Sequence, residues 1–352
     1  MIDYDNYNLD EEIKKLEIFK VPKYNKYLNT YGYKKIVKQL FDIEDIDSID
    51  AYLFHGIILT DHELWKRTEN YKMPIICTRN DQLEYYLKNG RNKDNTFAVG
   101  ALFPQYKNLN NIKHVENPKG TIVYPAHSGA SLFYNISWEN YIKKLKELPE
   151  EFHPIDICMY YTDVLDGHHK IFTDNGFKVY MAGHRLDPDF VDNFYEILRH
   201  YKYATANTSV ASNLLYSIEF GIPTFVYGEE NENFIPIPKD SNSKYAKELH
   251  PQGYEEYYKF HDTELKKVIP EYPHQDIQIT EEQKEKVQHI LGLDFEYDKK
   301  KVKKSLLRYA SKKKIKQKIK DYFKPIINIT KCPKNKKQII LFSFIKISYK
   351  QK

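Results

Sequence analysis

The pattern of apolar and polar positions predicts short strands that alternate with longer helices, the order typical of βα units around a parallel sheet. Two sets of such units can be distinguished. In the first set we expect strands at 51–54, 74–77 and 96–99, with a helix over 81–88. The polar stretch 105–120, rich in Asn and Lys and ending in Pro-Lys-Gly, then predicts a linker between two domains.

The second set is clearer, because each apolar run stops at a cluster of small or polar residues. Its five expected strands are 121–124, 155–160, 177–181, 203–206 and 222–227. Helices are expected over about 138–148, after Asp187 as N-cap and Pro188 as first helical residue, and through Leu214, Leu215 and Ile218 to Gly221. Strands about 20 to 25 residues apart are typical of βαβ units. The pattern therefore predicts an α/β protein with two Rossmann-like domains facing a cleft, where ligands lie at the carboxyl ends of the strands.

Composition places the chain among soluble globular proteins. Its 352 residues are 41% hydrophobic and 29% charged. The sequence contains no apolar stretch long enough to span a membrane, and its acidic start does not resemble a signal peptide. The odd, widely spaced cysteines Cys77, Cys158 and Cys332 predict free thiols in a reducing compartment. We therefore expect a cytoplasmic protein with domains at 1–115 and 116–298 and an extension at 299–352.

Charge is distributed unevenly along the chain. Residues 299–352 hold 20 Lys and Arg against one acid, Asp321, whereas the remainder has a net charge of −14. Apolar residues of the extension form two stripes at helical spacing, one of Val302, Leu306, Tyr309 and Ala310, the other of Ile315, Ile319, Tyr322 and Phe323. A basic amphipathic segment predicts attachment to the anionic inner face of the cell membrane. Packing on the acidic body is the alternative, and nucleic-acid binding is not expected because no recognised motif accompanies the charge.

Candidate binding residues follow the strands of the second set. They are His127, Ser128 and Gly129 after the first strand, Gly183, His184 and Arg185 after the third, Asn207, Thr208 and Ser209 after the fourth, and Glu229 after the fifth. Because the carboxyl ends of parallel strands share one edge of a sheet, we expect these residues to converge. The arginine offers a planar fork for a diphosphate or carboxylate, and His184 a donor or proton-transfer group; a helix-capping turn is the alternative for both.

Small hydroxyl residues at 207–209 lie between a strand and a helix. Free backbone N–H groups at a helix start attract phosphate. Ordinary N-capping by Thr208 or Ser209 is the alternative interpretation.

A general base has to face this edge from the first domain. The candidates are His55, Asp61 and His62, which follow the strand at 51–54. The chain lacks zinc-type Cys and His spacing, a Gly-rich nucleotide loop and a GxSxG elbow. We therefore expect no bound metal, no cofactor and no covalent nucleophile.

Three segments carry a resemblance to a known family. PAHSG at 125–129, AGHRLDPDF at 182–190 and TANTSVASNLLYSIEFGIPTFVYG at 205–228 together resemble the nucleotide-sugar half of GT-B glycosyltransferases from bacterial capsule and O-antigen polysaccharide clusters. AVGALFP at 98–104 is similar to the strand and loop that precede the interdomain crossing in that superfamily. The resemblance covers roughly residues 50 to 230.

The resemblance implies transfer of a sugar from a nucleotide-sugar donor to a polysaccharide or lipid-linked acceptor, without a metal. Residues 116–298 would hold the donor and residues 1–115 the acceptor. Arg185 and a helix start at Thr208 and Ser209 would neutralise the leaving phosphate. Glu219 matches only one member of the acidic pair that holds the donor sugar in that family. A nucleotide-sugar epimerase of the same fold and a non-catalytic sugar-binding or scaffold protein are the alternatives.

Overall fold

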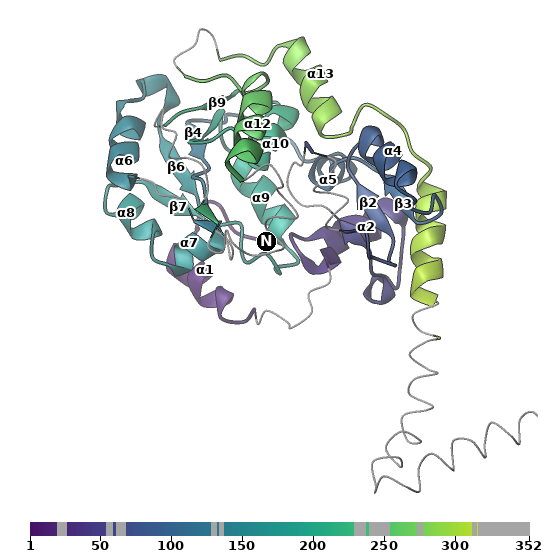
Figure 1. Cartoon of the computed structure of the whole chain (residues 1–352). Helices are drawn as coiled ribbons and strands as arrows, with labels where there is room; N and C mark the ends of the chain where they lie inside the picture. The colour runs from purple at the N-terminus through teal and green to yellow at the C-terminus, as the bar shows by residue number, and fades with distance from the viewer. Residues whose placement is uncertain are drawn as a thin grey trace, which may run out of the picture.

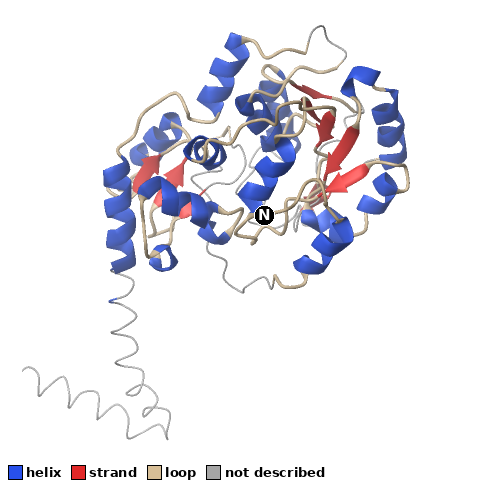
Figure 2. Cartoon of the chain, turned by 180° about the vertical axis from the view of Figure 1, so that it is seen from behind, coloured by secondary structure: helices blue, strands red, loops and turns tan. Residues whose placement is uncertain are grey.

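The computed structural model describes residues 1–19, 27–53, 59–60, 68–127, 132–133, 137–228, 237–238, 254–272, 277–311 and 315. Within these ranges the chain is an α/β protein with two parallel sheets that lie apart in the molecule (Figure 1). Helices lie around both sheets (Figure 2). A short antiparallel pair, β5 (Leu132–Phe133) with β10 (Ile237–Pro238), accompanies them.

The larger sheet has the strand order β7-β6-β4-β8-β9, and every neighbouring pair is parallel. Its strands are β4 (Thr121–Val123), β6 (Ile155–Cys158), β7 (Lys178–Tyr180), β8 (Tyr203–Ala206) and β9 (Thr224–Val226). The five predicted strands are thus confirmed; β8 has the predicted bounds and the other four are shorter. β4 comes first in sequence but lies in the middle of the sheet. From β4 the chain adds β6 and β7 on one side and then β8 and β9 on the other, so the order in which strands are added changes direction between β4 and β8. That topological switch point is where open α/β sheets bind ligands.

Helices of this half follow the predicted apolar faces. They are α6 (Trp138–Glu147), α7 (Tyr161–Leu165), α8 (His169–Thr173), α9 (Phe190–Leu198) and α10 (Ser212–Phe220). α10 ends as predicted at Gly221, whose φ of 97° suits glycine. α9 begins later than predicted: Asp187 Oδ1 accepts the N–H of Asp189 at 2.8 Å, and this turn precedes the helix.

The smaller sheet has the order β1-β2-β3, with β1 (Tyr52–Leu53), β2 (Ile75–Cys77) and β3 (Thr96–Ala98). Around it lie α2 (Tyr33–Phe41), α4 (Asn80–Lys88) and α5 (Leu102–Leu109). The predicted linker at 105–120 is wrong in its first part, because 105–109 completes α5. Phe103 and Tyr106 form a buried face of that helix, and Pro104 is tolerated in its first turn, where no N–H partner is needed.

Both ends of the chain contact the half of the molecule that is remote from them in sequence (Figure 1). At the start, α1 (Leu9–Leu16) lies near α7, and the Met181 N–H donates to the Tyr7 hydroxyl at 2.9 Å. At the other end, α13 (Glu281–Ile290) packs on α10, and the Ala101 N–H donates to the Leu291 carbonyl at 2.7 Å. The predicted domain boundary after residue 115 separates the strands of the two sheets in sequence. The segments that contact each half of the molecule, however, come from both sides of this boundary.

Residues 299–311 form a helix that packs on the smaller sheet's side of the molecule. Val302, Leu306 and Ala310 are buried, and the Ser305 hydroxyl donates to the Asp94 carbonyl at 2.7 Å. For this part of the extension, packing on the body is confirmed. The second predicted stripe lies outside the described residues apart from Ile315. No helix in the described ranges is both long enough and apolar enough to cross a membrane.

Candidate functional site

A cavity of about 270 Å³ lies at the carboxyl ends of the larger sheet. Residues that follow four strands line it: Tyr124, Pro125, Ala126 and His127 after β4, Met159 and Tyr160 after β6, Ala182 and Gly183 after β7, and Thr208 after β8. Convergence at one edge, as predicted for these loops, therefore holds for His127, Gly183 and Thr208. The lining residues after β4 and β8 flank the switch point of the sheet, where open α/β sheets bind ligands.

The rest of the lining comes from helices and from the first part of the chain. It consists of Tyr31, Tyr33, Phe103, Phe190, Phe194, Val210, Ala211, Ser212, Asn213, Tyr216 and, from α12 (Tyr254–Lys266), Tyr258; Cys158 completes it. No described residue of the lining is Asp or Glu. Ligand pockets are typically apolar with a few placed polar groups, and this cavity has that character without a negative charge to repel an anion.

Asn207 ties together the two loops of the switch point. Its Oδ1 accepts the N–H of Ala126 at 2.7 Å, and only 3% of the residue is exposed. Its Nδ2 is buried without a hydrogen-bond partner among the described residues. The next residue, Thr208, lines the cavity and accepts the N–H of Val210 at 3.2 Å.

The first turn of α10 faces this cavity. The helix begins at Ser212, and the N-cap position is Ala211, which has no side chain to cap it. A helix start at Thr208 and Ser209 is therefore wrong, because the Ser209 hydroxyl donates instead to Asp262 of α12 at 2.6 Å. Ser212 and Asn213 both line the cavity. First-turn N–H groups lack intrahelical acceptors, so together with the helix dipole they favour a bound anion.

The loop after β7 holds His184 away from the cavity lining. The ring stacks on Phe19 at 5.0 Å between centroids and lies 4.3 Å from Tyr161, and its Nδ1 accepts the Leu186 N–H at 3.1 Å. Burial, and to a smaller extent the charge of Arg185, lowers the pKa of His184. At neutral pH the residue is thus a neutral, packed part of the turn, as in the capping alternative.

Arg185, in the same loop, does not line the cavity, but its charge acts on Tyr31 and Tyr160, which do. Its carbonyl accepts the N–H of Tyr31 at 2.6 Å, and its Nε is buried without a hydrogen-bond partner among the described residues. The hydroxyls of Tyr31 and Tyr160, which both line the cavity, are 2.9 Å apart. The loop therefore joins the end of β7 to the first part of the chain beside the cavity.

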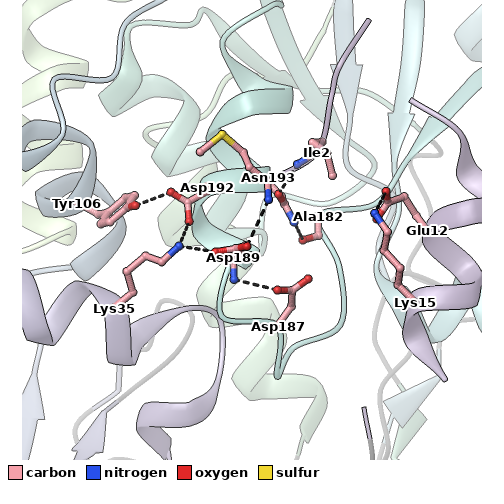
Figure 3. Close-up of polar contacts among 11 residues, drawn as sticks. Ile2, Glu12, Lys15, Lys35, Tyr106, Ala182, Asp187, Asp189, Asp192 and Asn193 are labelled. Carbon is pink, nitrogen blue, oxygen red and sulfur yellow. Dashed lines mark hydrogen bonds and ion pairs between the residues drawn. The ribbon is translucent and has the colours of Figure 1, made fainter. Parts of the chain in front are cut away.

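A polar cluster fixes the position of this loop (Figure 3). Lys35 of α2 bonds both Asp189 and Asp192 at the start of α9, and Tyr106 of α5 donates to Asp192. Asn193 donates to the Ala182 carbonyl at 3.1 Å. Helices of the smaller half thus hold the loop of the larger half in place.

Six of the predicted site residues lie outside the described residues. They are His55, Asp61, His62, Ser128, Gly129 and Glu229. Leu59 lies between His55 and Asp61 in the sequence and is described. Its N–H donates to Nε2 of the buried His261 at 3.1 Å. His261 is in α12, three residues after the cavity-lining Tyr258. Residues 59–60 therefore lie beside the helix that contributes to the cavity.

Glu219 does not reach the cavity. It bonds Lys107 of α5 at 2.7 Å, and both side chains are largely buried. Because it lies near the end of α10, about 10 Å along the helix from Ser212, it joins two helices and does not hold a sugar.

Two further groups bear on chemistry. Cys77 and Cys158 are free, and burial raises the pKa of Cys158 to about 12, so its thiol in the cavity wall stays protonated.

Across the ranges that the structure describes, no group of three or more His, Cys, Asp or Glu side chains could hold a metal ion.

The sequence reasoning missed the aromatic residues Tyr31, Tyr160 and Tyr258. With 31 tyrosines in the chain, composition gave no reason to single out any of them. Tyr160 alone carried a positional signal, because it follows a predicted strand.

No protein-family model matches the chain, and no curated protein matches it. Similar solved structures include HepE from Anabaena in complex with UDP-glucose, at 10% identity over 74% of this chain and 72% of that chain, with a TM-score of 0.30. MnaA from S. aureus with UDP has 13% identity over 82% of this chain and 87% of that chain, with a TM-score of 0.32. UDP-GlcNAc 2-epimerase from Neisseria meningitidis bound to UDP-GlcNAc has 11% identity over 86% and 90%, with a TM-score of 0.28. Likenesses of this size establish neither a shared fold nor a shared activity. The assignment of the chain to α/β proteins with a ligand-sized cavity therefore rests on the two parallel sheets and the cavity described above.

Proposed function

We propose that the protein is a glycosyltransferase of the GT-B type that moves a sugar from a nucleotide-sugar donor to a polysaccharide or lipid-linked acceptor without a metal. The first turn of α10 is the observation that supports this most directly. Ser212 and Asn213 of this turn line a cavity at the switch point of the larger sheet, and the described lining contains no carboxylate. Such a site suits the diphosphate of a nucleotide sugar.

In the proposed reaction, an acceptor hydroxyl attacks the anomeric carbon while the bond from that carbon to the donor phosphate breaks. Negative charge grows on the leaving diphosphate, and the N–H groups around Ser212 and Asn213 stabilise it. Fixed dipoles aimed at developing charge are usually the largest catalytic contribution. The proton of the hydroxyl goes to one of the candidate bases that follow β1 in sequence, His55, Asp61 or His62.

The size of the cavity limits what it encloses. At about 270 Å³ it is near the lower end of ligand pockets, which hold about 300–1,000 Å³. A sugar phosphate fits such a volume, so the nucleoside is expected to lie outside it. The same small volume favours a second candidate, a nucleotide-sugar epimerase, because that reaction needs no room for an acceptor.

Attachment to an anionic membrane surface remains part of the proposal. On the helix at 299–311, Lys300, Lys304 and Arg308 are exposed at a spacing of four residues, beside Leu307 at 39% exposure. Each basic residue near an anionic leaflet contributes about 1 kcal/mol. Sedimentation with phosphatidylglycerol vesicles should fall in the Lys300→Glu, Lys304→Glu double variant, and unchanged sedimentation would contradict this role.

Calorimetric titration with UDP, GDP and CMP tests nucleotide binding first. The nucleotide that binds identifies the donor class, and its nucleotide sugar is then incubated with the protein and followed by NMR. Free nucleotide that accumulates faster when lipid extract is added supports the transferase. A new sugar configuration on an intact nucleotide supports the epimerase. If none of the three nucleotides binds, the result favours the binding or scaffold role over both enzymes.

A further inference from the structure

The cavity has a second set of polar donors, separate from the first turn of α10. Tyr31 and Tyr160 line it with their hydroxyls 2.9 Å apart, and the ring of Tyr160 lies 4.3 Å from that of His127. Tyr31 comes from the first part of the chain, whereas the other two follow β6 and β4. Three aromatic polar groups from three segments therefore meet at one place in the wall.

Arg185 adds a positive charge to this set. Its backbone is fixed to that of Tyr31 by the 2.6 Å hydrogen bond, and its buried Nε lacks a hydrogen-bond partner in the described part of the chain. The nearby carboxylates of Asp189 and Asp192 bond Lys35 (Figure 3). The loop thus presents a guanidinium beside the phenols without a described carboxylate that neutralises it.

Both phenols stay protonated at physiological pH. Burial raises the pKa of Tyr31 and of Tyr160, and the opposing effect of the Arg185 charge is smaller in each case. One of the two hydroxyls donates to the other, so at most one phenol hydrogen of the pair is left for a ligand, and a guanidinium offers only donors. An acceptor-only group with negative charge, a carboxylate or a phosphate, matches this combination.

The strand order separates this set from the first turn of α10. Tyr160 follows β6, and Arg185 follows β7, whereas α10 follows β8. In the order β7-β6-β4-β8, β6 lies two strand spacings from β8, about 10 Å, and β7 lies three, about 14 Å. The two sets of donors therefore start from different strands of the sheet.

We propose that Tyr31, Tyr160 and Arg185 bind a second oxyanion, carried by the sugar or by the acceptor that reacts in the cavity. The inference rests on the proposed function and narrows its substrate class to acidic sugars or acceptors with a phosphate. Charged hydrogen bonds of this kind change affinity by about 10- to 100-fold.

Two arms of a calorimetric experiment on the full chain distinguish the sources of the oxyanion. In the first, the protein is titrated with UDP-glucose and with UDP-glucuronic acid, or with GDP-mannose and GDP-mannuronic acid if GDP is the nucleotide that binds. In the second, protein saturated with the nucleotide is titrated with glucose, glucuronic acid and glucose 1-phosphate. At least about 10-fold tighter binding of an acidic ligand in the first arm assigns the oxyanion to the donor sugar, and in the second arm to the acceptor.

Arg185→Gln should abolish this preference and leave the affinity for the free nucleotide within about threefold. Arg199→Gln, which removes an arginine paired with Glu196 outside the cavity lining, is the matched control and should retain the preference. Melting curves check that each variant is folded. Tyr31→Phe, which keeps the ring, should reduce the preference by about 3- to 10-fold.

Equal affinity for acidic and neutral ligands in both arms would overturn the inference while leaving the proposed function intact. If Arg185→Gln loses as much affinity for the free nucleotide as for the acidic ligand, the inference is also overturned, because the arginine would then hold the donor diphosphate. Failure of every nucleotide to bind the wild-type protein would instead overturn the proposed function, and this inference with it.

Discussion

Asn213 offers a substitution whose effects on stability and on ligand binding should have opposite signs. It is the second residue of α10 and lines the cavity. Asn213→Asp adds one negative charge with almost no change in size. In the first turn of a helix that charge is favourable, by about 0.3–1 kcal/mol. At a site for phosphate the same charge is unfavourable.

The size of the second effect follows from Coulomb's law. For unit charges about 5 Å apart, the repulsion is about 3 kcal/mol at an effective dielectric constant near 20 and about 1 kcal/mol in bulk water. The affinity for a nucleotide diphosphate should therefore fall by about 5- to 150-fold. The fall should shrink as salt is added, to the extent that the site is open to solvent.

Thermal denaturation and calorimetric titration on the same preparation measure the two effects. Without nucleotide, Asn213→Asp should melt at or above the wild-type temperature, and with nucleotide it should gain less. Asn213→Ser, which adds no charge, should bind nucleotide nearly as well as wild type. If Asn213→Asp binds nucleotide with wild-type affinity, the diphosphate does not lie at the start of α10.

The remaining predictions concern stability. Because the pKa of His184 is lowered from 6.5, the unfolded chain takes up more protons below that pH, so stability is complete above pH 6.5 and falls below it; His184→Asn should flatten this fall in denaturant titrations from pH 7.5 to 5. Leu306→Ala, at a fully buried position, should cost about 2–5 kcal/mol, whereas Leu307→Ala next to it should cost less than about 0.5, and equal costs would contradict the packing of this helix. A double-mutant cycle of Lys35→Ala with Asp192→Ala should give a coupling of about 0.5–1 kcal/mol that decreases with salt, and zero coupling would show that the cluster does not fix the loop.

The larger sheet could be predicted because its signal is local. Strands buried on both faces read as continuous apolar runs, and β4, fully buried along Thr121–Val123, is such a run. The residues that follow these strands were then expected to share one edge, and His127, Gly183 and Thr208 do line one cavity. Periodicity and strand direction were enough for that step.

The start of α10 could not be predicted in the same way. Thr208 and Ser209 are good capping residues, so local propensity placed the helix start there. The Ser209 hydroxyl is instead engaged by Asp262, which is 53 residues away in sequence. A contact of that separation leaves no trace in the local pattern, and it moves the phosphate-binding turn to Ser212 and Asn213.

The charge of the extension shows a similar limit. An excess of lysine next to an acidic body predicts attraction to both the body and an anionic membrane, and the sign of the charge cannot separate the two. Geometry separates them by face: Val302 and Leu306 are buried on the body, and Lys303 bonds Asp42 at 2.9 Å. The apolar stripe of this helix is therefore not available to lipid. Any membrane contact made by residues 299–311 has to use the opposite face, where Lys304 and Leu307 are exposed, and so should depend on salt more than on buried apolar area.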